Sequence, residues 1–245
     1  MFDIYFYITA ISAVMLFGIS KGGFAGPMAI LAVPLMSMSI SPVIAAGIML
    51  PILIVMDITA LYFYWNQWDI KNIKLIIPPS IMGILIGSLT FSYISDDGVR
   101  IIIGTIAILF ILFTILQSNN LLIKPSKNKG IFWSTIAGYT SFLIHAGGPP
   151  LNFYLLPQKM DKTIYVATFT LAFAIINAVK LIPYYFLGQL APAYIVISLI
   201  LLPLAPIGII IGYYLHKKVS EKIFYKFIYI FLAIGGVKLI YDGIF

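Results

Sequence analysis

The chain has 245 residues, of which 62% are hydrophobic and 9% charged, and its mean hydropathy is +1.06. A soluble domain carries roughly 25% charged residues, so this composition excludes a soluble globular protein. It predicts an all-α polytopic membrane protein in a lipid bilayer. The formal net charge of +7 favours lysine-rich cytoplasmic loops over a surface that binds nucleic acid.

The residue types present also limit the chemistry. The chain contains no cysteine and only two histidines, so disulfides, thiolate metal sites and cysteine nucleophiles are excluded. We therefore expect no metal site and no cofactor. The first residues have no basic region and include Asp3, so we do not expect a cleaved signal peptide.

Apolar runs long enough to cross the hydrocarbon core predict the transmembrane helices. Two regions, about 3–38 and 130–158, are apolar but interrupted by glycine and proline. The segments beside each break are short for a span, which predicts half-helices or a re-entrant pair. The uninterrupted runs lie at about 41–65, 73–94, 98–117, 163–187, 192–215 and 223–241.

The two halves of the chain resemble each other, which predicts an internal duplication. A shift of about 123 positions places Pro27 on Pro150 and sets Asp57 opposite Lys180. With two extra residues, the sequence GILIG in the first half falls on GIIIG in the second. Both are small-xxx-small patterns, which predict close helix packing.

Loop charges predict that the two halves insert in opposite orientations. The loops NQWDIKNIK, IKPSKNKG, PQKMDK and HKKVSEK satisfy the positive-inside rule together if all four are cytoplasmic. This arrangement requires an odd number of passes per half and places both termini outside, whereas four parallel spans per half would put HKKVSEK outside. We predict one membrane domain of two inverted-topology repeats, 1–124 and 125–245, each with a broken helix pair followed by three transmembrane helices.

Four ionisable residues lie inside the apolar regions: Lys21, Asp57, His145 and Lys180. A charge at mid-span costs at least about 2.5–3.5 kcal/mol. Two of these residues lie in the interrupted regions, and the other two lie in the long helix that follows each of them. This distribution is expected of a binding site at the interface between inverted repeats.

The interrupted sequences SKGGFAGP and HAGGPP predict an anion site. A helix that starts after a break presents free backbone N–H groups and the positive end of its dipole. Glycine lets a ligand approach the backbone, and Lys21 and His145 could add positive charge. The alternative is tight helix packing with Lys21 extended toward the membrane surface. The predicted substrate-binding residues are Lys21, Gly22, Gly23, Gly26, Asp57, His145, Gly147, Gly148, Pro149, Asn152, Asn177 and Lys180.

Several of these side chains have alternative roles. Asn177 and Lys180 lie three residues apart and share a helix face, which could be a substrate wall, but Lys180 could instead pair with Asp57 or extend toward the outer surface. Asn152 could reach a ligand or form an interhelical hydrogen bond. His145 could exchange protons, because an unperturbed histidine titrates near pH 6.5, or it could bond a backbone carbonyl.

The sequence resembles the TauE/SafE family of sulfite exporters, in the branch that carries HAGGPP. The resemblance rests on SKGGFAGPMAILAVP, HAGGPPLNFYLLP and FAIINAVKLIPYYFLGQ and covers essentially the whole chain. Members of the family typically have three glycines in the first motif, where this chain reads KGGFAG.

The resemblance implies a secondary transporter in the cytoplasmic (inner) membrane. Its cargo would be a small anion of the sulfite, thiosulfate or sulfonate class, moved by alternating access, with proton coupling left open. An anion channel of the same architecture is the alternative. An integral-membrane enzyme is disfavoured, because the loops carry lysines and no cluster of carboxylates and histidines. The sequence allows a homo-oligomer but does not require one.

Overall fold

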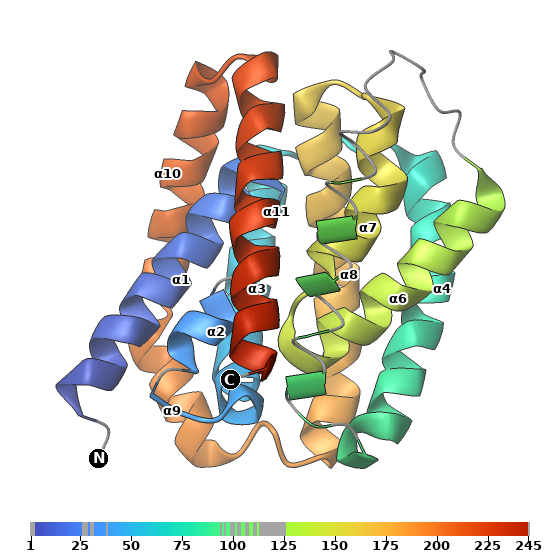
Figure 1. The fold of residues 1–245 in the computed structure, drawn as a ribbon. Helices are drawn as coiled ribbons and strands as arrows, with labels where there is room; N and C mark the ends of the chain where they lie inside the picture. Colours follow the sequence, from blue (N-terminus) through green and yellow to red (C-terminus); the bar gives the residue numbers. More distant parts are fainter. Residues whose placement is uncertain are drawn as a thin grey trace.

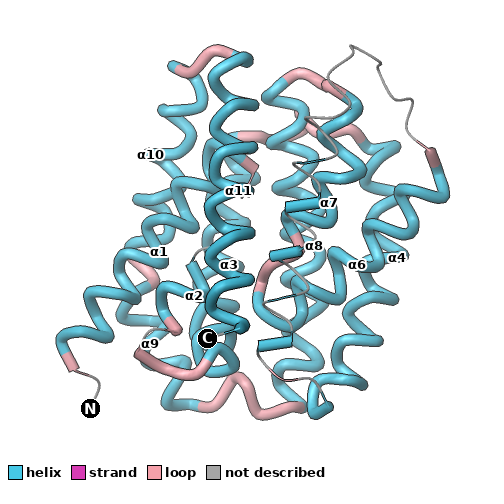
Figure 2. The backbone as a smooth tube through the Cα atoms, viewed as in Figure 1, coloured by secondary structure: helices cyan, strands magenta, loops and turns pink. Residues whose placement is uncertain are grey.

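The described part of the chain is a bundle of helices, with no strand among its residues (Figures 1 and 2). The structure is a computed structural model. It describes residues 3–25, 29, 32–37, 39–93, 95, 97–98, 101, 104–105, 108–109, 112 and 126–244. The helices are α1 (Ile4–Phe24), α2 (Ala32–Met36), α3 (Pro42–Phe63), α4 (Ile70–Thr90), η2 (Phe91–Tyr93), α6 (Lys127–Ile144), α7 (Gly148–Leu155), η3 (Leu156–Gln158), α8 (Lys162–Phe186), α9 (Pro192–Leu201), α10 (Leu204–Lys218) and α11 (Glu221–Ile244).

Helix lengths and composition agree with a multi-pass membrane protein. Among the described residues, α1, α3, α4 and α8 are each long and apolar enough to cross a membrane. The pair α9 and α10, bent by 45° at the break between them, could form a fifth span. The predicted run 192–215 is therefore two helices, while 98–117 lies mostly outside the described residues.

The first interrupted region differs from the expectation of two short segments. α1 is a continuous helix of 21 residues that runs through the glycine pair and ends at Phe24. The glycines do not break this helix because they are its contact surface with α10. A Cβ on Gly22 would lie 2.3 Å from the carbonyl oxygen of Ile209, and one on Gly23 would lie 2.2 Å from that of Gly212.

The GIIIG and GILIG sequences do pack closely, as predicted. Gly208 and Gly212, on α10, face Gly18 and the carbonyl of Ile19 on α1. On the other side of the bundle, a Cβ on Gly83 of α4 would lie 2.0 Å from the carbonyl oxygen of Thr135 on α6. Each half of the chain therefore packs one of its helices against the first helix of the other half: α10 against α1, and α4 against α6.

The described basic loops, at 64–69, 157–161 and 218–220, gather at one end of the bundle, and the described ends of the chain lie at the other (Figure 1). Hydrogen bonds tie these loops to the first turns of α8: the Asp69 N–H donates to Thr168 Oγ1 at 2.8 Å, and Lys162 Nζ donates to the Val219 carbonyl at 2.6 Å. α3 ends near this cluster and α8 begins there, so the two helices are antiparallel. Figure 1 shows that α1 and α6 also run in opposite directions.

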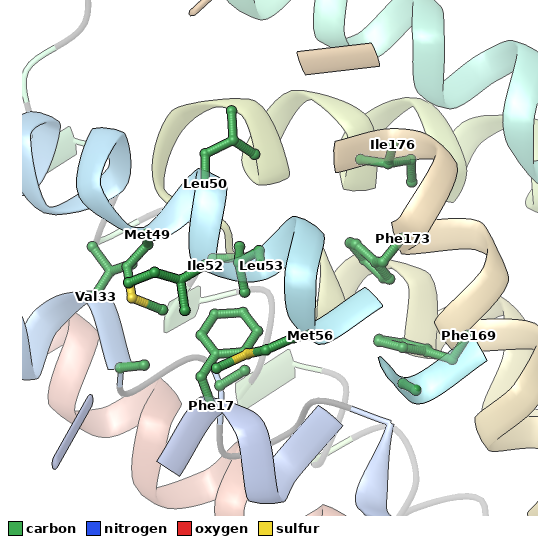
Figure 3. Packing of buried hydrophobic residues seen from close by; sticks show 14 of the residues in the cluster. Phe17, Val33, Met49, Leu50, Ile52, Leu53, Met56, Phe169, Phe173 and Ile176 are labelled. Atoms are coloured by element: carbon green, nitrogen blue, oxygen red, sulfur yellow. The ribbon is translucent and has the colours of Figure 1, made fainter. Parts of the chain in front are cut away.

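Buried apolar side chains fill the centre of the bundle between α1, α3 and α8. Figure 3 shows Phe17 next to Met56, with Phe169 and Phe173 pointing toward them from α8. All four side chains are buried. The aromatic rings on α8 therefore face the helices of the first half of the chain rather than lipid.

Candidate functional site

The first helix of each interrupted region, α1 or α6, is followed by a residue with left-handed backbone geometry. Ala25 follows α1 with φ 55°, and His145 follows α6 with φ 58°. A left-handed residue after the last helical turn redirects the chain and bonds back to that turn, as the His145 N–H does to the Ser141 carbonyl at 3.0 Å. α7 then starts at Gly148.

Side chains from neighbouring helices satisfy the carbonyls that these helix ends leave without an intrahelical partner. The Tyr64 hydroxyl donates to the Gly22 carbonyl at 2.7 Å, and the Tyr184 hydroxyl donates to the Phe142 carbonyl at 2.6 Å. His216 Nδ1 lies 3.0 Å from the Gly23 carbonyl. Side chains of other helices therefore bond both helix ends, and Tyr64 and Tyr184 do so in the same way.

A buried ion pair connects α1 and α3. Lys21 Nζ lies 2.5 Å from Asp57 Oδ1, and both side chains are nearly inaccessible. Asn177 Nδ2, on α8, donates to the other carboxylate oxygen of Asp57 at 2.7 Å. The unit formed by Lys21 and Asp57 is neutral, and the hydrogen bond from Asn177 joins it to the second half of the chain.

A second buried cation has neutral partners. Lys180 is fully buried. Its Nζ donates to the Ser141 carbonyl at 3.0 Å and to the Ser141 hydroxyl at 3.1 Å, and it lies 2.7 Å from His145 Nδ1. No carboxylate of the described residues lies within ion-pair distance of Lys180. Its positive charge therefore lacks a counter-ion in the described part of the protein.

The tautomer of His145 follows from its two contacts. Nε2 lies 2.9 Å from the Ala46 carbonyl oxygen. A carbonyl only accepts, so Nε2 carries a proton. Nδ1 then accepts from Lys180, because two positive charges at 2.7 Å would repel strongly. His145 and Lys180 together hold at most one positive charge.

The Lys21–Asp57 pair and the Lys180–His145 pair both border a cavity between the halves of the chain. Its polar wall contains Lys21, Ser141, His145, the backbone of Gly148 and Asn177, while Lys180 lies directly behind Ser141 and His145. Aromatic rings from α1 and α8 supply much of the apolar lining, with Phe17 and Phe173 one turn from Lys21 and Asn177. The cavity is lined by Phe17, Lys21, Ala29, Leu53, Ser141, His145, Gly148, Phe169, Phe173 and Asn177.

Several predicted site residues have other surroundings. Gly22 and Gly23 lie inside the last turn of α1, so their amides are not freed by the break, contrary to expectation. Pro149 follows Gly148 at the start of α7, where it provides no N–H donor. A Cβ on Gly147 would lie 2.5 Å from the Ala137 carbonyl oxygen, so packing requires this glycine.

The remaining predictions concern Asn152, Lys180 and Gly26. Asn152 forms an interhelical hydrogen bond, accepting from the Tyr165 hydroxyl at 2.5 Å, and is not among the cavity-lining residues. Lys180 does not pair with Asp57, because it turns toward Ser141 and His145. Gly26 lies outside the described residues.

Sequence reasoning missed Ser141, Tyr64, Tyr184 and His216. The two tyrosines lie in aromatic runs at helix ends, which resemble an interfacial belt. His216 lies in a basic loop sequence, although its side chain is buried. The one available signal was spacing: Tyr64 and Tyr184 are as far apart as Asp57 and Asn177, which are separated by 120 residues.

The structural correspondence between the halves differs from the sequence register. The shift of about 123 set Asp57 opposite Lys180. In the structure, the equivalent position to Asp57 is Asn177, and the equivalent position to Ala25 is His145, which has the same left-handed geometry; both pairs are 120 residues apart. A displacement of three residues is nearly one helical turn. It preserves the match of apolar faces, which is why the sequence alone did not reveal it.

Comparisons with known proteins assign a family. The family model described as "Sulfite exporter TauE/SafE" matches residues 10–239. Neither curated proteins nor solved structures give a match. Within the described residues, no group of histidine and carboxylate side chains is arranged to hold a metal ion.

Proposed function

Because the chain belongs to the sulfite exporter TauE/SafE family, we propose that it is a secondary transporter whose substrate anion binds in the cavity between the two halves. One observation carries the proposal: the buried cation Lys180 has only neutral partners among the described residues. A buried charge without a counter-ion is costly in a membrane. A bound anion would provide the missing charge.

The cavity wall supplies suitable anion ligands. The Ser141 hydroxyl accepts from Lys180, which leaves its own proton available to a ligand. Gly148 is the first residue of α7, so its N–H has no intrahelical partner. The prolines that follow remove two further donors, and this amide is therefore the helix-end donor beside the cavity.

The arrangement supports alternating access between two inverted repeats. The matched left-handed breaks, the two tyrosine contacts and the Asp57–Asn177 pair recur at one spacing, and the equivalent helices α3 and α8 are antiparallel. In this proposal, the repeats 1–124 and 125–245 rock against each other around the cavity. Access to the anion then alternates between the two sides.

The end with the basic loops is proposed to face the cytoplasm, with both termini outside. The chain has no native cysteine, so single cysteines report orientation directly. We expect Lys218→Cys, at the basic end, and Leu187→Cys, at the other end, to react with an impermeant thiol reagent from opposite sides of the membrane. Both positions are exposed. Reaction of both from the same side would contradict this orientation.

Uptake into proteoliposomes tests the function. Purified protein is expected to move sulfite or methanesulfonate with a saturable rate and to exchange labelled anion across the bilayer in the absence of a gradient. A channel of the same architecture would give non-saturating current under voltage instead. Uptake that does not exceed that of protein-free liposomes for either anion would refute the transporter proposal.

A further inference from the structure

We propose that the cavity is selective for monovalent anions that carry an apolar group, such as short alkyl sulfonates, and discriminates against divalent anions such as sulfate and thiosulfate. The inference rests on the proposed function, since it concerns the anion that occupies the same cavity. Two separate observations lead to it: the number of positive charges around the cavity, and the aromatic side chains in its lining.

The cavity has at most one uncompensated positive charge. Asp57 neutralises Lys21 at 2.5 Å. Lys180 and His145, 2.7 Å apart, share at most one more charge. The other buried histidine of the described residues, His216, lies 3.0 Å from the Gly23 carbonyl in the last turn of α1 and is not among the residues that line the cavity. One negative charge on the ligand therefore completes the balance.

A divalent anion would leave one negative charge without a partner in the membrane interior. Such a charge lowers a binding constant by about 100-fold. No other described cation is buried at the cavity to offset it. Charge alone therefore separates methanesulfonate from sulfate, although both are tetrahedral and of similar size.

The aromatic part of the lining is suited to an apolar group. This part consists of Phe17 on α1 and Phe169 and Phe173 on α8, together with Leu53. An inorganic oxyanion would lose hydration against these rings without gaining hydrogen bonds. An alkyl group gains about 0.8 kcal/mol per buried methylene, which is about fourfold in affinity. Ethanesulfonate should therefore bind more tightly than methanesulfonate.

A carboxylate exchange tests the charge count. Asp57 and Asn177 are in direct contact at 2.7 Å, so each can take the other's side chain with little change in volume. Asp57→Asn releases Lys21 and raises the charge of the cavity by one. Asn177→Asp lowers it by one. The double variant D57N/N177D restores the original charge with the carboxylate on α8 in place of α3.

Binding of methanesulfonate, ethanesulfonate, sulfate and thiosulfate to detergent-purified protein would be measured by calorimetry. We expect wild type to prefer the sulfonates by about 100-fold, Asp57→Asn to gain sulfate and thiosulfate binding, and D57N/N177D to regain the sulfonate preference. A gain of binding cannot arise from misfolding, so the Asp57→Asn result is informative even if that variant is less stable.

The outcomes separate this inference from the proposed function. Wild-type protein that binds sulfate or thiosulfate as tightly as the sulfonates would overturn the monovalent selectivity and leave the transporter proposal intact. So would an Asp57→Asn variant whose affinities for monovalent and divalent anions change equally. Binding of none of the four anions would overturn both.

Discussion

Replacing Lys180 with methionine is expected to lower anion uptake into proteoliposomes by at least about 100-fold. The reason is that Lys180 is the buried cation for which no carboxylate partner lies within reach among the described residues. Methionine has a similar length and no charge, so the cavity would be neutral and a bound anion would have no counter-ion. Initial rates of methanesulfonate uptake give the measurement.

The control for Lys180→Met is Lys129→Met, which removes an exposed lysine near the start of α6. This variant should transport at the wild-type rate, because a surface charge is solvated and screened. Thermal unfolding in detergent verifies that Lys180→Met is folded. A folded Lys180→Met protein that transports at the wild-type rate would show that Lys180 is structural.

Replacing Lys21 with methionine is expected to lower the free energy of unfolding by about 3–5 kcal/mol. Lys21 forms the buried ion pair with Asp57, and its loss leaves a buried carboxylate with Asn177 as its remaining hydrogen-bond donor. The double variant K21M/D57N removes both charges and should recover most of the loss. Chemical denaturation of the purified proteins in detergent measures both effects.

A surface ion pair provides the matched control for Lys21→Met. Lys238 and Asp242 lie four residues apart on α11 and are partly exposed. Lys238→Met should change stability by no more than about 1 kcal/mol. If K21M/D57N were as unstable as Lys21→Met, packing of the lysine stem rather than charge would explain the loss.

The helical architecture and the location of the buried charges could be predicted from the sequence. Long apolar runs locate α3, α4 and α8 within a few residues, because the membrane requires a fixed length of apolar helix. An ionisable residue in such a run has few tolerable positions. Lys21, His145 and Asn177 consequently line one cavity, with Asp57 and Lys180 bonded directly to its wall.

The detailed geometry depended on contacts that a single sequence does not show. Glycine pairs can break a helix or allow close packing, and at Gly22 and Gly23 the packing against α10 decides the outcome. Lys21 pairs with Asp57 and Lys180 contacts His145. These partners depend on a register between the halves that differs from the sequence match by about one helical turn. The hydroxyl contacts of Tyr64 and Tyr184 involve carbonyls 42 residues away, a distance at which local patterns give no information.

The most direct test of the account locates an anion in the protein. Crystals grown with bromoethanesulfonate contain a bromine atom whose anomalous scattering marks one end of the ligand. We expect a bromine peak beside Phe169 and Phe173, with the sulfonate density against Ser141 and the Gly148 amide. A ligand bound outside this cavity, or bound within it in the reverse orientation, would contradict the account.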